Sequence, residues 1–221
     1  MAGANVTKRE DVGVPVTNVA TRFKGYAPET ERPVRKAEVV EDETLKKLKT
    51  AWKRYDIRIE TVVLVPDPQA EEYYGKVSKL LGNMGVRCSS GDVEKFCVAL
   101  VEFQGEENFE EKAGVFLSAL MNHGTDEDYR IVTRHLDRLL GYIGYRNIKN
   151  ITVEGDVRDM LGNAMEGGRI VVNGNTGHDT AHAIHGGEIH INGDCKGLGD
   201  IYGGMIHQNG KLIAFKGYKG L

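Results

Sequence analysis

Apolar and polar residues alternate at a fixed interval in the C-terminal third of the chain. The blocks 151–155, 170–174 and 189–193 each read apolar, variable, apolar, polar, Gly, and 206–210 follows this pattern more loosely. The closing glycines, at positions 155, 174, 193 and 210, are therefore 19, 19 and 17 residues apart. Such alternation predicts short strands whose apolar residues face one side. The fixed short period predicts that these strands belong to a repeat architecture.

Turn-forming residues flank the blocks. Asn-Gly closes the second and third blocks, and both residues tolerate a positive φ. A Gly-Gly pair precedes the second, third and fourth blocks and indicates a second bend. One repeat is therefore expected to hold two or three very short strands joined by sharp turns. The positions that define the repeat are Gly155, Gly174, Gly193, Gly210, Gly168, Gly187, Gly204, Asn173 and Asn192.

A coil this short cannot bury its own apolar side, whereas a stack of coils buries a continuous core. The repeats therefore predict a β-solenoid with about 4.8 Å between neighbouring strands. A meander of hairpins is the competing interpretation. It would not require Gly-Gly and Asn-Gly to recur in the same phase, so the solenoid is favoured.

A solenoid predicts columns of equivalent side chains. Asn173 and Asn192 are expected to form a ladder at one turn. Gln208 interrupts an inner column, so the last coil is expected to be frayed or to act as a cap. The inner columns are predicted to be Ile151, Ile170, Ile189 and Ile206, and Val153, Val172 and Ile191, and the outer column Thr152, Val171, His190 and His207.

The repeats resemble the glycine-rich (GXGXG) β-helix domain of the glutamate synthase large subunit, a domain type that also forms one of the subunits of formylmethanofuran dehydrogenase. The resemblance rests on MEGGRIVVNGNTG, IHGGEIHINGDCKG and IYGGMI and covers about 65 of the 221 residues. It implies a right-handed parallel β-helix with a structural role, which holds other domains or subunits in place. It implies no catalytic side chains in this domain.

The chain before the repeats predicts two further parts. Residues 1–41 are polar, contain three prolines and predict an extended arm. Residues 42–146 alternate helical and strand patterns and predict an α/β domain, and residues 147–221 form the glycine-rich β-helix domain. The predicted fold class is thus an α+β N-terminal domain followed by a short right-handed parallel β-helix, the handedness being implied by the resemblance.

Periodicity places individual elements in the N-terminal domain. Thr125 is expected to cap the last helix, and Asp67 with Pro68 to start the second one. The turn Pro-Asp-Pro at 66–68 follows the first strand, where a Rossmann nucleotide site needs glycines, so such a site is excluded. We expect this domain to pack on the first coil. Helices are predicted over 42–55, 68–81, 107–122 and 125–143, and strands over 57–65 and 95–103.

Composition narrows the possible partners. A net charge of −3 and a pI near 6.2 give no general attraction to nucleic acid or to an anionic membrane. No apolar run approaches the roughly 20 residues that span a bilayer, and the N-terminus lacks the apolar region of a signal peptide. The three cysteines include no CxxC pair and predict free thiols in a reducing cytoplasm.

Histidines are the main candidates for chemistry. His178, His182 and His185 have a spacing that resembles metal-ligand motifs, although solvated or interface histidines are the favoured interpretation. The glycine-rich stretches 174–178 and 193–200 superficially resemble phosphate-binding loops but lack GxxxxGK[ST], so we interpret them as solenoid corners. No acid–base pair, nucleophile or cofactor site is indicated by the sequence.

The leading functional hypothesis is a non-catalytic scaffold or assembly subunit. It would form a homo-oligomer or dock the catalytic subunits of an oxidoreductase complex. One alternative is a metal-dependent enzyme that uses the three histidines. Another is a glutamate-synthase-like subunit that is active only in a complex with separate amidotransferase and flavin-binding chains.

Overall fold

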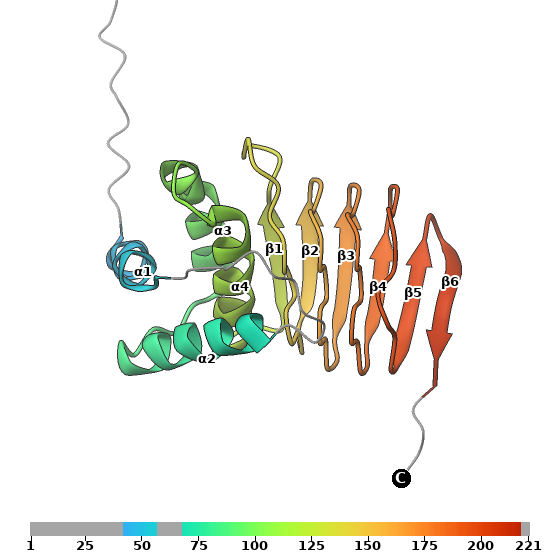
Figure 1. The fold of residues 1–221 in the computed structure, drawn as a ribbon. Coiled ribbons are helices and arrows are strands. Elements are labelled where there is room, and N and C mark those ends of the chain that lie inside the picture. Colours follow the sequence, from blue (N-terminus) through green and yellow to red (C-terminus); the bar gives the residue numbers. More distant parts are fainter. Residues whose placement is uncertain (1–41, 57–67, 218–221) are drawn as a thin grey trace, which may run out of the picture. The chain divides into compact units, whose positions relative to one another are not determined.

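A computed structural model of the chain describes residues 42–56 and 68–217 (Figure 1). The arm predicted for 1–41 and the strand predicted for 57–65 lie outside the described residues. The helices are α1 (Glu43–Arg54), α2 (Pro68–Asn83), α3 (Ser90–Ala99), the 3-10 helix η2 (Leu100–Phe103) and α4 (Phe109–Asn122). The strands are β1 (Asp128–Val132), β2 (Asn150–Glu154), β3 (Arg169–Asn173), β4 (Glu188–Ile191), β5 (Gly204–Gln208) and β6 (Lys211–Lys216).

Three of the four predicted helices are confirmed as α1, α2 and α4. Asp42 caps α1 by accepting a hydrogen bond from the backbone N–H of Leu45 at 2.8 Å. The apolar stripe of α1 ends in Trp52, which is fully buried and stacks on Phe103 with 5.3 Å between ring centroids. The predicted fourth helix does not form.

The strand predicted for 95–103 is wrong, because this segment lies in α3 and η2. Ser89 and Asp92 form a capping box that starts α3. Val93, Phe96 and Leu100 are buried at helical spacing. The β-branched and aromatic residues that suggest a strand therefore serve a buried helix instead.

The helix predicted for 125–143 is also wrong. Residues 128–132 form β1, in which Tyr129 and Ile131 are buried and alternate with exposed neighbours. The N–H of Thr125 donates to the carbonyl of Cys88 and does not open a helix. Parallel pairing with β2 outweighs the local helical signal, and the sheet therefore begins within the predicted N-terminal domain.

The six strands form one sheet in sequence order, and β1 to β5 are parallel (Figure 1). Ile151, Ile170, Ile189 and Ile206 stand in register on consecutive strands, as do Val153, Val172 and Ile191. All seven are 2% exposed or less. The predicted β-solenoid and its inner columns are thus confirmed, and a hairpin meander is excluded for β1 to β5.

The turn ladder and the outer column are confirmed as well. The Nδ2 of Asn192 donates to Oδ1 of Asn173 at 2.9 Å. His190 and His207 stand in register, and their rings stack with 4.5 Å between centroids. Gln208 pairs with Ile191, and its side-chain amide donates to the carbonyl of Gly193. The chain then reverses into β6, which closes the last coil as an antiparallel hairpin.

Helix α4 joins the helices to the solenoid at Gly114 and Ser118. A Cβ added to Gly114 would lie 1.6 Å from the carbonyl oxygen of Gly141. The Ser118 hydroxyl donates to the carbonyl of Gly114 at 2.7 Å and accepts from the N–H groups of Gly144 and Tyr145. Helix α4 therefore lies so close to the 141–145 segment that only glycine fits at position 114.

One continuous hydrophobic core includes buried residues from both the helices and the solenoid. Charged pairs reinforce the junction on its outside. Glu110 of α4 forms ion pairs with Arg138 and Arg158, and Arg146 pairs with Glu71 of α2 and with Glu166. The helices thus cover the β1 end of the sheet, while the β6 end has no covering element among the described residues (Figure 1).

Candidate functional site

The three histidines considered as metal ligands have different surroundings. His178 and His185 are exposed, whereas His182 is buried. The Nδ1 of His182 accepts a hydrogen bond from the N–H of Asp200 at 3.3 Å. The ring of His185 lies against Tyr202, with 5.5 Å between ring centroids. Residues 178–185 form turns, so their sequence spacing does not bring the imidazoles together as a helix would.

Within 42–56 and 68–217, no three His, Cys, Asp or Glu side chains are grouped so that they can hold a metal ion. His190 is instead held on the outer face by Glu188, 3.2 Å from its Nε2, and by the ring of His207.

Close packing explains the glycine-rich stretches. A Cβ on Gly174 would lie 2.3 Å from the carbonyl oxygen of Gly155, and one on Gly193 would lie 2.4 Å from that of Gly174. Consecutive coils touch through their backbones at this corner. The glycine-rich stretches thus lie at corners of the solenoid, as predicted.

The cysteines differ in burial. Cys88 and Cys97 are 1% and 0% exposed, and burial raises the pKa of each thiol to about 12. Cys195 is half-buried on the solenoid. Because the thiolate is the reactive form, the two buried cysteines are poor nucleophiles in the folded protein.

We expect one of the three thiols to react rapidly with an aromatic disulfide reagent in mildly alkaline buffer. Cys88 and Cys97 should react only after denaturant is added, because their raised pKa values keep them protonated. Absorbance of the released thiol measures both phases. Cys195→Ser should abolish the rapid phase, and a rapid phase that survives this change would show that the buried pair is accessible.

Large apolar side chains are exposed at the β6 end of the solenoid. Met205 pairs with Phe215, and His207 pairs with Leu212 across a register shift, so all four lie on the outer face of the sheet. Phe215 is 64% exposed and Leu212 is 55% exposed. We call Leu212, Ile213, Phe215 and Tyr202 the apolar end of the solenoid.

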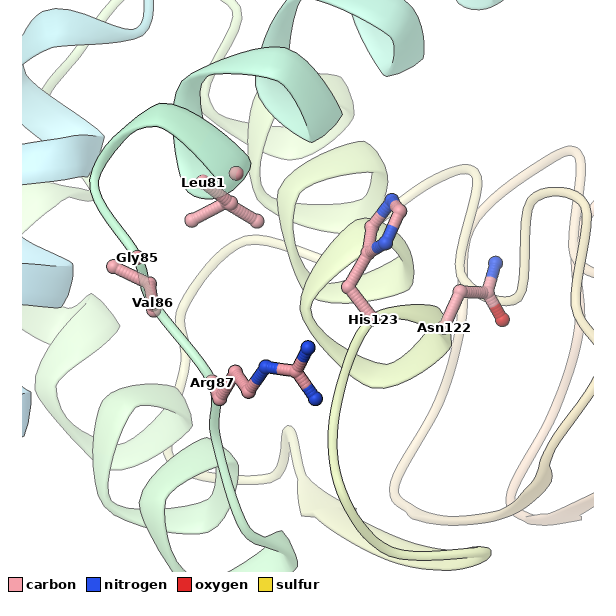
Figure 2. A pocket seen from close by; sticks show the side chains of 7 residues that line it. Leu81, Gly85, Val86, Arg87, Asn122 and His123 are labelled. Atoms are coloured by element: carbon pink, nitrogen blue, oxygen red, sulfur yellow. The ribbon is translucent and has the colours of Figure 1, made fainter.

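A cavity of about 370 Å³ lies where α2 and α4 end (Figure 2). Figure 2 shows the Arg87 side chain reaching from the extended segment after α2 toward the end of α4. Arg87 and His123 are exposed, and Arg87 forms no hydrogen bond or ion pair with any residue that the structure describes. The lining residues are Leu81, Gly82, Gly85, Val86, Arg87, Asn122 and His123.

A second cavity of about 380 Å³ shares the Asn122–His123 wall. Its cation, Arg146, lies 2.8 Å from Glu71 and 2.8 Å from Glu166 and is therefore neutralised within the protein. The Asn122 amide donates to the Tyr74 hydroxyl and to the carbonyls of Tyr145 and Arg146, which fixes the shared wall.

The first cavity is not among the features predicted from the sequence. The sequence features nearest to this cavity are the Gly-Asn pair at 82–83, which ends α2, and an isolated arginine at 87. The cavity depends on two helix ends that are about 40 residues apart in sequence and meet only after folding.

In the described part of the chain, no helix combines the length and apolar character that crossing a bilayer requires. Comparison of the sequence and the structure with protein-family models, curated proteins and solved structures finds no match.

Proposed function

We propose that this protein is a non-catalytic assembly subunit whose solenoid docks other protein chains. The partners are catalytic subunits of an oxidoreductase, copies of the same chain, or both. The observation that carries the proposal is the apolar end of the solenoid: an edge strand with exposed Leu212, Ile213 and Phe215 on a rigid sheet.

The solenoid suits docking because its apolar inner columns support a rigid outer wall. Its inner columns consist of fully buried isoleucine and valine side chains. Successive coils are joined by main-chain hydrogen bonds and by the Asn173–Asn192 ladder, so the outer wall has a fixed shape. A wall fixed in this way can hold neighbours with little loss of conformational entropy on binding.

The outer edge of β6 suits strand addition. It has no strand neighbour among the described residues, so its backbone N–H and C=O groups can pair with an extended segment of another chain. Lys211 and Lys216 border the edge and favour a partner segment with acidic ends. The exposed Phe215 and Leu212 are the kind of large apolar side chains that anchor interfaces.

The repeats also support a specific kind of assembly. Their in-phase Gly-Gly and Asn-Gly resemble the β-helix domain of the glutamate synthase large subunit, which suggests a right-handed solenoid and an oxidoreductase partner of that type. This step rests on analogy of sequence and fold, since a fold alone does not fix a function.

Reconstitution tests the proposal. The purified chain is mixed with the products of neighbouring genes, and the complexes are weighed by native mass spectrometry. We expect a stoichiometric complex that is lost in the double variant Leu212→Lys, Phe215→Lys. The matched control Val98→Lys, Val101→Lys changes two exposed valines of the helical part and should leave the complex intact. Equal loss in both variants would contradict docking at the apolar end.

A further inference from the structure

The cavity between the ends of α2 and α4 is bordered by one full positive charge and by the partial negative charges of two helix ends. Arg87 supplies a full positive charge that no described residue neutralises. The C-terminal ends of α2 and α4 both line the cavity, through Gly82 and through Asn122. A helix C-terminus carries about half a negative charge, which favours a cation within the last turn.

Two of the other lining residues, Leu81 and Val86, are apolar. Leu81 is 1% exposed and Val86 is 9% exposed, so both present the cavity with side chains that are otherwise part of the core. The volume of about 370 Å³ is near the lower limit for small-molecule sites. These properties select a small ligand with an anionic group, a cationic group and an aliphatic body.

We propose that this cavity binds a free α-amino acid with an aliphatic side chain. The Arg87 guanidinium binds the carboxylate, for which its planar fork is suited. The ammonium group lies at the carbonyl ends of α2 and α4, beside the His123 ring. The side chain packs against Leu81 and Val86.

Hydrogen bonds hold the Asn122 side of this site in place, and the space beside Gly82 is open. Asn122 is held by its three donated hydrogen bonds and accepts one from the N–H of Ile148. A Cβ on Gly82 would meet no atom within 4 Å, so the space above this helical glycine is empty. The site does not depend on the assembly role, because it lies at the opposite end of the described chain from β6.

Three matched probes test the proposal: L-leucine, 4-methylpentanoate, which lacks its amino group, and 3-methylbutylamine, which lacks its carboxylate. Each is titrated into the full-length protein while the backbone amide resonances of Gly82, Gly85 and Val86 are followed by NMR. We expect saturable shifts with leucine at a dissociation constant on the order of 1 mM. Each analogue should bind about tenfold more weakly, because it loses one charge-assisted contact.

Two variants locate the binding. Arg87→Gln should abolish saturation by leucine and by 4-methylpentanoate, whereas the control Lys79→Gln, an exposed change of equal charge on α2, should not. Gly82→Leu should fill the empty space, block all three probes and leave the fold intact. Shifts that are absent, or that persist in Arg87→Gln, would overturn the proposal. Equal affinity for leucine and 4-methylpentanoate would overturn the role of the helix ends.

Discussion

Gly114→Ala should destabilise the protein by about 3 kcal/mol, because the new methyl group cannot fit between α4 and the solenoid. Its Cβ would lie 1.6 Å from the carbonyl oxygen of Gly141, which is backbone and cannot rotate away. The helix must move outward, and the hydrogen bonds that the Ser118 hydroxyl accepts from the N–H groups of Gly144 and Tyr145 are then stretched or broken. Urea denaturation followed by circular dichroism measures the change in the free energy of unfolding.

The same substitution at Gly75 is the matched control. Gly75 lies in the middle of α2, and a Cβ added there would meet no atom within 4 Å. Alanine is favoured over glycine inside a helix, so Gly75→Ala should raise the free energy of unfolding by about 0.5–1 kcal/mol. Destabilisation by both changes, or by neither, would contradict the close approach of α4 to the solenoid.

Ile170→Ala should cost about 2–5 kcal/mol, since it leaves a cavity in the centre of the solenoid. Ile170 is 0% exposed and stands in register between Ile151 and Ile189. Its Cδ1 also occupies the space beside Gly144, where a Cβ would come within 2.4 Å. Neighbouring coils cannot collapse into the gap without losing their backbone pairing.

Val171→Ala, one residue along the same strand, separates this effect from strand propensity. Val171 is half-buried on the outer face, so its loss should cost at most about 1 kcal/mol. Denaturation curves of the two variants should therefore differ clearly in midpoint. Equal losses would show that the inner column does not carry the stability of the stack.

The solenoid could be predicted because its signal is repeated. Four blocks end in a glycine and three of them follow a Gly-Gly pair in the same phase, so a misreading of one block is corrected by the others. Register follows directly, since a shift by one residue would turn every isoleucine of the column to solvent. Even the outward pairing of His190 with His207 follows from this phase.

The helical part lacks such redundancy. The segment 95–103 is rich in residues that favour strands. It forms a helix because the capping box at Ser89 starts one and because its side chains are buried on several sides. The sequence of 125–132 begins with a helix-capping pattern, but residues 128–132 pair with the edge of β2 and form β1. Both outcomes depend on tertiary partners that local patterns do not specify.

The candidate sites differ in the same way. The apolar end arises from the last repeat, but its exposure depends on the register shift that places Leu212 and Phe215 on one face. The three histidines are related by their spacing in the sequence and are separated by turns in the structure. The cavity at Arg87 needs the ends of α2 and α4 to meet, which no short stretch of sequence indicates.

The mass of the native complex tests the assembly role most directly. The wild-type chain and the Leu212→Lys, Phe215→Lys variant are each isolated under native conditions from cells that contain the natural partners, and the masses are compared. Assembly through the apolar end predicts a defined complex for the wild type, of identical copies or with an oxidoreductase subunit, and a free monomer for the variant. A monomeric wild type, with the same mass as the variant, would contradict the assembly role.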